Sequence, residues 1–266
     1  MRLLEMKWPE VEERAPKCVA LCPTGALEQH GHHLPLGTDT LIVTHIAEQV
    51  EARCRDWVVL LPTLWMGSSH HHLGFAGTMS VSAPLFTEMA AQEARCLVSA
   101  GFRKIVFLNG HGGNMVPLNQ AMHGLSHEYR ELPELWISHS TYWITASLSP
   151  ETAPLMETGN VSHACEYETS MILHLRHDLV DMSKAKGERA EQFQSAYVFQ
   201  QDEGPSRVSI ARPFETWTGT GAMGQPQLAT RAKGEQLLTV AADGVVDFLT
   251  EFRAWKPGGS LRPQAG

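Results

Sequence analysis

The sequence predicts an α/β fold: a three-layer sandwich in which a mostly parallel central sheet is covered by helices on both faces. Short apolar runs such as CVALCP and KIVFLNG have the composition of buried parallel strands. Segments with apolar residues at helical spacing separate these runs. Alternation of strands and helices is the pattern of parallel sheets, whose crossover connections are helices.

Four strands and four helices are expected in order along the chain. The strands are expected at residues 18–23, 57–62, 104–110 and 134–140, and the helices at about 40–53, 83–101, 115–129 and 230–252. Ser82 caps the second helix, Pro84 lies in its first turn and Gly101 ends it. Residues 183–229 contain Gln, Gly and Pro with weak periodicity, which predicts long loops.

Composition limits the classes of function. With 266 residues, of which 43% are hydrophobic, the chain has enough apolar material for one substantial core. No repeat or linker stands out, so we expect one domain over residues 1–266 with a disordered tail from about residue 256. A net charge of -8 without a basic run argues against a nucleic-acid partner. The lack of a signal layout and of an apolar run of about 20 residues predicts a cytoplasmic protein without a membrane partner.

Histidine is the unusual residue type, with 14 copies that mostly occur in clusters. The five cysteines form no CxxC pair, which argues against a disulfide framework and against a zinc–thiolate site. Histidines of this kind therefore point to a site without thiolate ligands.

The stretch EQHGHHLPLGTD follows the first predicted strand and carries Glu28, His30 and Asp39. In extended chain Glu28 and His30 point to the same side, and the Gly-containing turn can fold Asp39 back towards them. His111 follows the third strand between glycines, which allow close backbone approach. Since strand ends of a parallel sheet line one crevice, these residues can converge there. Carboxylate and imidazole ligands suit a divalent ion such as zinc or manganese, and a bridging aspartate suits two ions.

The stretch HACEYETS carries His163, Glu166 and Glu168, and its conformation is open at this point. In a helix, His163 and Glu166 share a face while Glu168 projects elsewhere. In an extended chain, Glu166 and Glu168 share a side. The spacing does not distinguish these alternatives.

Four blocks together resemble the creatininase (creatinine amidohydrolase) family. They read PTGALEQHGHHLPLGTD at residues 23–39, GSSHHHLGFAGT at 67–78, NGHGGN at 109–114 and HACEYETS at 163–170, and GAMGQPQLATRAKGEQLL at 221–238 is a fainter match. The blocks span most of the chain in the family's order. The resemblance implies a creatininase-like sandwich, a dinuclear metal-dependent amidohydrolase and a homo-oligomer, a hexamer in the family.

The resemblance also implies a role for each matching residue. The metal ligands it implies are Glu28 and His111 for one ion, His30 and Glu168 for the other, and Asp39 between the two. The ions are expected to be zinc, with manganese or iron as alternatives. A role in ligation or in support of the ligands stays open for Glu166.

His163 matches the family's catalytic histidine, and the residues matched to substrate binding are His72, Gly112 and Trp143. We expect a metal-bound hydroxide to attack a C–N amide carbonyl while His163 gives a proton to the leaving amine. His32, His33, His70 and His71 are interpreted as loop, surface or supporting residues, and Cys165 as an incidental small residue.

The third block departs from creatininase proper, which has NGHYEN where this chain has Gly112 and Gly113. A tryptophan–aspartate pair of creatininase is replaced by Gly159 and Asn160. The chain therefore resembles more closely the branches with NGHGGN and HAGExETS, which include formamide deformylases and a peptidase of redox-cofactor maturation. The expected substrate is a small cyclic amide or formamide compound. The alternatives are a creatinine amidohydrolase proper and a catalytically silent metal- or ligand-binding relative.

Overall fold

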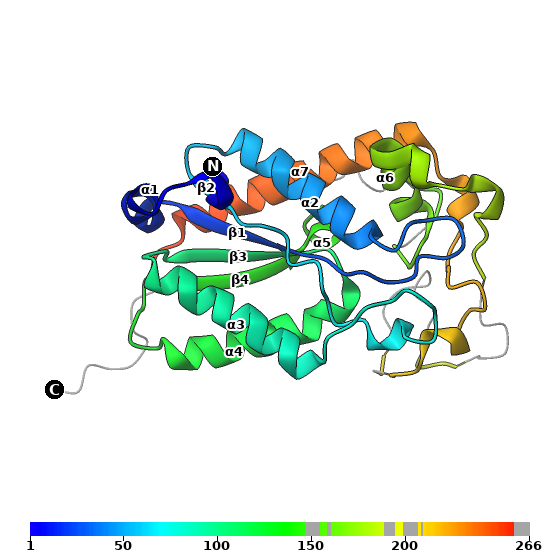
Figure 1. Cartoon of the computed structure of the whole chain (residues 1–266), viewed down its shortest axis with the longest axis horizontal. Helices are drawn as coiled ribbons and strands as arrows, with labels where there is room; N and C mark the ends of the chain where they lie inside the picture. The colour runs from blue at the N-terminus through cyan, green and yellow to red at the C-terminus, as the bar shows by residue number, and fades with distance from the viewer. Residues whose placement is uncertain (147–154, 159–160, 189–194, 199–206, 209, 258–266) are drawn as a thin grey trace.

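The central sheet has four parallel strands in the order β2-β1-β3-β4 (Figure 1). The strands are β1 (Val19–Thr24), β2 (Val58–Leu60), β3 (Lys104–Asn109) and β4 (Trp136–Thr141). The structure is a computed structural model, and it describes residues 1–146, 155–158, 161–188, 195–198, 207–208 and 210–257. The predicted α/β fold with a parallel sheet is confirmed.

Helices cover both faces of the sheet, which makes the three layers visible in Figure 1. One face carries α2 (Thr38–Arg53), α5 (Tyr142–Ala146), α6 (Glu166–Arg176) and α7 (Arg231–Ala254). The other face carries α3 (Ala83–Ser99) and α4 (Met115–Glu128), and the short helix α1 (Trp8–Arg14) precedes β1. The helices α1 and α5 have no counterpart among the predicted elements.

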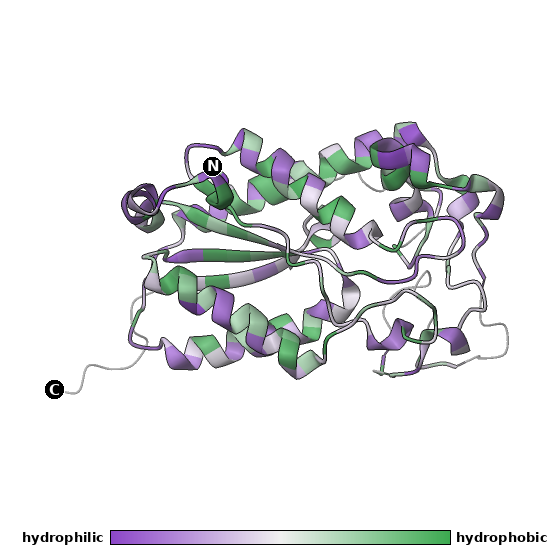
Figure 2. Ribbon diagram, in the orientation of Figure 1, coloured by the Kyte–Doolittle hydropathy of each residue, from purple (hydrophilic) through white to green (hydrophobic). Residues whose placement is uncertain are grey.

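Alternation along the strands divides the core into two clusters. In β1, Val19 and Leu21 face the cluster beneath α2 and α7, whereas Ala20 and Cys22 face the cluster beneath α3 and α4. In Figure 2 the hydrophobic colour is strongest along β1 and β3, between helices that carry both hydrophobic and hydrophilic residues. Burying a large aliphatic side chain contributes about 1.5–3 kcal/mol, so both clusters hold the layers together.

Two boundaries differ from the predicted ones in ways that matter for the site. Helix α2 begins at Thr38, because the backbone N–H groups of Thr38 and Leu41 already donate to Pro35 and Gly37. Asp39 therefore lies in the first helical turn rather than in the turn before it. Helix α6 begins only at Glu166, so its preceding residues follow neither the fully helical nor the fully extended alternative.

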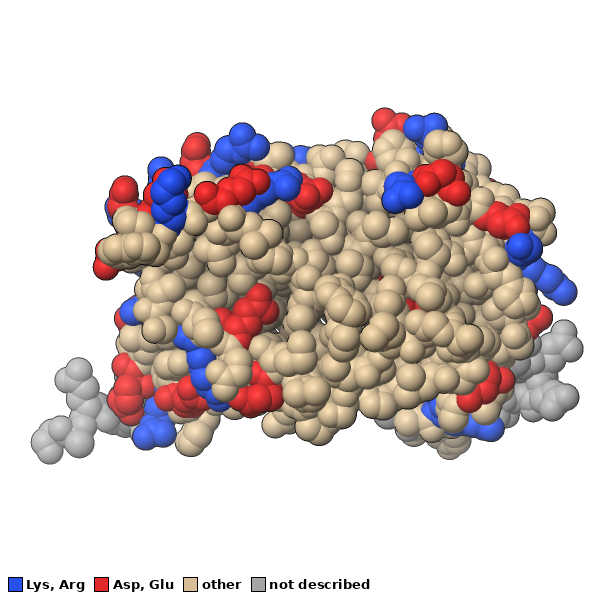
Figure 3. Space-filling view, viewed as in Figure 1, with Lys and Arg blue, Asp and Glu red and all other residues tan. Residues whose placement is uncertain are grey.

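The surface and the ends of the chain bear on the remaining predictions. No helix in the described ranges is long and apolar enough to cross a membrane. On the face drawn in Figure 3, acidic and basic side chains are interspersed over the outer helices. Residues 258–266 of the predicted tail lie outside the described residues, and the single-domain organisation stays a prediction.

The strand order places a switch point between β1 and β3. From β1 the chain moves outward to β2, whereas from β3 it moves outward in the opposite direction to β4. In open parallel sheets, the loops that leave two such strands at their carboxyl ends bound a ligand crevice. These are the loops that carry EQHGHH and NGHGGN.

Candidate metal centre

The loop after β1 turns the chain back on itself and buries Glu28 and His30. The Glu28 backbone N–H donates to the Leu36 carbonyl, which closes the loop directly before α2. Asp39 in the first turn of α2 thereby faces His30, with 3.0 Å between Asp39 Oδ1 and His30 Nε2. All three side chains are almost completely buried.

Two asparagines hold the loop after β3 in place. Asn109 accepts from the His111 backbone N–H and donates to the His111 carbonyl, and it also contacts Thr24 at the end of β1. Asn114 donates to the Gly25 carbonyl and accepts from the Ser68 N–H. These contacts tie together three loops. Sequence reasoning assigned no role to either asparagine, although both belong to the NGHGGN block.

The start of α6 points its two glutamates in different directions. Glu168 Oε1 lies 3.9 Å from His30 Nε2, and its Oε2 accepts from the Ala164 N–H. Glu166 instead accepts from Thr158 and from Lys233 of α7, so its oxygens are engaged away from His30. Of the two residues, Glu168 is the one that faces the buried cluster.

Asp39 connects two histidines. Its Oδ1 lies 3.0 Å from His30 Nε2, and its Oδ2 lies 2.9 Å from His111 Nδ1. Glu28 Oε1 lies 3.4 Å from His111 Nδ1 on the same side. The structure therefore brings together all five residues predicted as ligands, Glu28, His30, Asp39, His111 and Glu168. Their role as ligands stays a prediction.

Both histidines direct one ring nitrogen into this cluster and use the other to contact a backbone carbonyl. Imidazole nitrogen donates when its partner is a carbonyl oxygen, and His30 Nδ1 contacts the Glu28 carbonyl at 3.2 Å. His111 Nε2 contacts the Ser68 carbonyl at 3.1 Å in the same way. In the neutral rings, which are the form that binds a metal, the lone pairs would therefore lie on His30 Nε2 and His111 Nδ1, the nitrogens that face the carboxylates. Metal-binding histidines characteristically donate their other N–H to such partners.

Three buried atoms of the cluster make no hydrogen bond in the described part of the chain: Glu28 Oε2, His30 Nε2 and Asp39 Oδ2. These atoms lie close together without hydrogen-bond geometry, so they face the space between them and are not paired with one another. Three buried carboxylates, those of Glu28, Asp39 and Glu168, also need compensating positive charge. The donor set therefore fits divalent cations.

The pKa values of the ion-free chain show how strongly this cluster attracts positive charge. Burial opposes protonation of His30, yet the Asp39 and Glu168 carboxylates raise its pKa to about 9. Glu28 and Asp39 raise the pKa of His111 well above its ordinary value in the same way. Burial raises the pKa of Glu168 to about 7. The buried carboxylates therefore attract protons strongly, and a divalent cation would supply the positive charge that they need.

His163 and His72 lie on the other side of Glu28. Its Oε1 is 3.4 Å from His72 Nε2 and 3.7 Å from His163 Nδ1. The two rings lie 4.4 Å apart, and the Phe214 ring packs on both, at 4.3 Å from His72 and 4.9 Å from His163. Burial and the neighbouring His30 lower the pKa of His163 to about 3, so its ring is neutral.

The other residues matched to substrate binding are placed differently. Gly112 is exposed after β3. Trp143 in α5 packs on the core and edge-on to Tyr142 at 5.0 Å. Their roles stay predictions, and Gly159 and Asn160 lie outside the described residues. Burial raises the pKa of the Cys165 thiol to about 11, which argues against a cysteine nucleophile.

Sequence reasoning missed several residues at this site. Phe214 comes from the long segment after α6 and carries no sequence signal. His71 was interpreted as a loop residue, but its ring lies parallel to His111 at 5.8 Å, and it can share a cation with Glu28 and His111. Gln29, whose amide lies between His72 and His163, is inside the EQHGHH block and received no role from the sequence.

The fold and the cluster define a parallel α/β protein with side chains able to hold metal ions. Residues 4–249 match the family model described as Creatininase: Creatinine amidohydrolase. The chain belongs to the creatininase family.

Curated relatives agree with this assignment. The mycofactocin precursor peptide peptidase of Mycobacterium tuberculosis is 31% identical over 244 residues, which cover 88% of this chain and 84% of that protein. The creatinine amidohydrolase of Pseudomonas putida is 29% identical over 260 residues, which cover 93% of this chain and 95% of that protein. The chain is a hydrolase of this family.

Solved creatininase structures have the same fold. A creatinine amidohydrolase superposes with a TM-score of 0.80 at 27% identity, covering 96% of this chain and 98% of that chain. A mutant creatininase described as Zn-Zn type gives 0.80, and one described as Creatininase Mn gives 0.77. Creatininases thus carry zinc or manganese.

Proposed function

We propose that the chain is a dinuclear metal-dependent amidohydrolase that cleaves a C–N amide bond. One observation carries the proposal: Asp39 places its two carboxylate oxygens 3.0 Å and 2.9 Å from ligand nitrogens of two different histidines. A carboxylate in that position can hold two cations at once. Glu28 lies 3.4 Å from His111 and would complete one cation site with it, and Glu168 lies 3.9 Å from His30 and would complete the other.

Divalent ions in these sites would supply a water of lowered pKa and a positive charge for the developing oxyanion. The ions expected are zinc, with manganese or iron as alternatives. The chain's own residues would perform the remaining tasks. His163 would move the proton from the attacking water to the leaving nitrogen, because its Nδ1 faces the cluster beside Glu28. Phe214 would keep bulk water from the His72–His163 pair.

The substrate we propose is a small cyclic amide or formamide compound. Creatinine itself is the first alternative, but Gly112 and Gly113 provide neither the tyrosine nor the glutamate of creatininase proper. A Cβ at Gly113 would clash with the Ser68 carbonyl oxygen, so this loop has no room for a glutamate.

A peptide amide is a second candidate, and one observation favours it. A Cβ at Gly112 would meet no heavy atom of the structure within 4 Å, so the space beside the cluster is open there. An open position accommodates a larger substrate than creatinine. The similarity to the mycofactocin precursor peptide peptidase agrees with this reading.

The test combines metal analysis with a hydrolysis screen over creatinine, formamidopyrimidines, hydantoins and small peptides. We expect two divalent ions per chain and turnover of at least one compound class. Asp39→Asn should lose ions and turnover together, whereas His163→Ala should keep the ions and lose turnover. Full hydrolysis by Asp39→Asn, or by protein stripped of metal, would rule out the dinuclear scheme.

The hexameric assembly and the cytoplasmic location follow from the family resemblance and from the sequence, respectively, and we retain both as proposals. Sedimentation equilibrium of the purified protein tests the assembly. A monomer at micromolar concentration would contradict it.

A further inference from the structure

The side-chain amide of Gln29 lies between the rings of His72 and His163. Its Nε2 is 2.8 Å from His72 Nδ1, 3.0 Å from His163 Nε2 and 3.0 Å from the Gly221 carbonyl oxygen. All four residues are buried or nearly so. We propose that Gln29 is a positioning residue that fixes the two histidines in opposite roles, His72 as a proton donor and His163 as a proton acceptor towards the cluster.

The backbone of Gln29 determines the state of His163. His163 Nε2 lies 2.7 Å from the Gln29 carbonyl oxygen, which can only accept. The proton of neutral His163 therefore resides on Nε2. Nδ1, which faces Glu28, is the nitrogen left to exchange a proton with the reacting groups.

The orientation of the Gln29 amide follows from its other contacts. Oε1 accepts from the Gly31 backbone N–H at 2.9 Å. A flipped amide would set its NH2 group against that N–H and its oxygen against the Gly221 carbonyl. The NH2 group therefore stays on the side of the two histidines.

The two amide hydrogens have two acceptors, the Gly221 carbonyl oxygen and His72 Nδ1. His163 Nε2 already carries a hydrogen, so its 3.0 Å contact with Gln29 is not a hydrogen bond. Since His72 Nδ1 accepts, the proton of His72 must be on Nε2, which faces Glu28 Oε1 at 3.4 Å. Two rings only 4.4 Å apart thus present a proton and a lone pair, respectively, to the same carboxylate.

The surrounding loop holds the amide in this position. Gly221 has a φ of +83°, and a Cβ there would clash with the Gln29 side chain. Glu188 accepts from the backbone N–H groups of Gly219 and Thr220, which fixes the turn that presents the Gly221 carbonyl. The contact between the Gln29 amide and the Gly221 carbonyl is therefore held by a fixed loop, and the Gln29 side chain is not free to rotate.

The catalytic consequence rests on the proposed function, but the proton positions do not. If His163 moves the proton to the leaving nitrogen, its bare Nδ1 must face the reaction, and His72 must not compete for that proton. Gln29 ensures both conditions, one through its carbonyl and the other through its amide.

Long-range ¹H–¹⁵N correlation spectra of protein with ¹⁵N-labelled histidine distinguish the two neutral tautomers. We would record them for the protein as purified and after loading with Zn²⁺, which is diamagnetic. The wild type should show the Nε2–H tautomer for both His72 and His163. Gln29→Glu should move the His72 proton to Nδ1, because a carboxylate only accepts, and Gln29→Met should give a mixture.

His163 serves as an internal control, because the Gln29 carbonyl is present in every variant and its tautomer should not change. Gln49→Glu is the matched external control, because exposed Gln49 of α2 makes a similar contact, 3.4 Å from His45 Nε2. It should leave the tautomers of His72 and His163 unchanged. A wild-type His72 with its proton on Nδ1, or a tautomer that is unchanged in both Gln29 variants, would overturn the inference.

Turnover of the substrate found by the screen provides the functional arm. Gln29→Glu should lower kcat by about 100-fold, in the range of general acid–base contributions, with unchanged Zn²⁺ content. Predicted tautomers in a wild type without any hydrolysis would refute the proposed function and leave the inference intact. Unchanged kcat in Gln29→Glu with an altered His72 tautomer would remove the catalytic role.

Discussion

Gly113 lies where the loop after β3 presses on the loop before α3. A Cβ at this position would clash with the Ser68 carbonyl and with the His111 ring. Gly113→Ala should therefore displace His111, destabilise the protein by about 2 kcal/mol and weaken metal binding. Urea denaturation and metal content of the dialysed protein measure the two effects.

The adjacent glycine provides the control for that change. A Cβ at Gly112 would meet open space, so Gly112→Ala should leave stability and metal content within error of the wild type. Equal effects of the two substitutions would mean that a general property of the loop, and not the Ser68 contact, is responsible.

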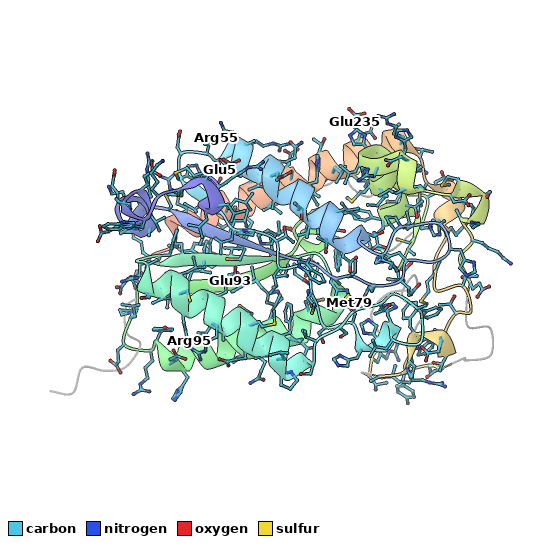
Figure 4. The ribbon with its side chains drawn as sticks, viewed as in Figure 1. Glu5, Arg55, Met79, Glu93, Arg95 and Glu235 are labelled. Carbon is cyan, nitrogen blue, oxygen red and sulfur yellow. The ribbon has the colours of Figure 1, made fainter. Side chains whose placement is uncertain are left out.

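Glu93 on α3 is a largely buried carboxylate whose negative charge destabilises the folded chain. It lies between α3 and the sheet (Figure 4), and after burial it is the second cause that raises the pKa of the Cys22 thiol of β1. No hydrogen bond or ion pair of its carboxylate occurs in the described ranges. Burial raises the pKa of Glu93 to about 7 from 4.5.

This shift has a definite sign for stability. The folded chain holds the Glu93 proton more tightly than the unfolded chain, so stability falls as the pH rises from about 4.5 to 7. Glu93→Gln should raise the free energy of unfolding by about 2 kcal/mol at pH 8 and change it little at pH 4.5. The figure of about 2 kcal/mol is smaller than the full pKa shift implies, because Glu93 is partly exposed. Denaturant titrations at both pH values measure the difference.

Glu235 on α7 points into solvent (Figure 4), which makes Glu235→Gln a matched control. It should change stability by less than about 0.5 kcal/mol at either pH. An identical gain in both variants at pH 8 would attribute the effect to net charge and contradict the burial argument.

A buried carboxylate adds an ion pair to the packed contact between α6 and α7. Glu166 at the start of α6 accepts from Lys233 Nζ of α7 at 2.6 Å, and Lys233 also donates to Glu157 at 2.7 Å. Lys233→Met would leave the Glu166 charge buried with only its Thr158 and Glu157 partners. We expect a loss of about 2 kcal/mol in the free energy of unfolding, measured by urea denaturation.

An exposed pair of the same chemistry provides the comparison. Lys184 and Asp181 form an ion pair at 2.9 Å on the surface, so Lys184→Met should cost less than about 0.5 kcal/mol. Adding Glu166→Gln to Lys233→Met should restore part of the lost stability. A double variant less stable than Lys233→Met alone would contradict the account.

For the molecule as a whole, the proposed ions would join three elements: the β1–α2 connection, the loop after β3 and the start of α6. Ligands that bind only the folded state stabilise it by about 2.7 kcal/mol at a hundredfold excess over Kd. Removal of ions by EDTA should therefore lower the melting temperature by several degrees, and added Zn²⁺ or Mn²⁺ should restore it. Calorimetry measures the shift.

Asp39→Asn is the control for the chelation experiment, because it should melt at the same temperature with and without EDTA. A wild type that contains no metal after purification and shows no shift on addition of either ion would refute the centre. That result would leave the fold untouched.

The sequence predicts the sheet more fully than it predicts the site. The strands after which EQHGHH and NGHGGN follow were predictable, since a buried parallel strand is a local run of apolar residues. The start of α2 at Thr38 was not, because it depends on how Pro35 and Gly37 close the turn. The choice between Glu166 and Glu168 was open, because a partner 67 residues away, Lys233, engages Glu166.

Local pattern was enough to predict the fold class, the four strands and the chemical types gathered after β1 and β3, because periodicity and side-chain chemistry are local properties. Which side-chain atoms meet in the site depends instead on how distant segments pack. Gln29 and His163 are 134 residues apart, and they meet because α6, which follows His163, packs on α2, which follows the loop of Gln29. Contacts at such separations arise from the packing of the layers, which no short stretch of sequence encodes.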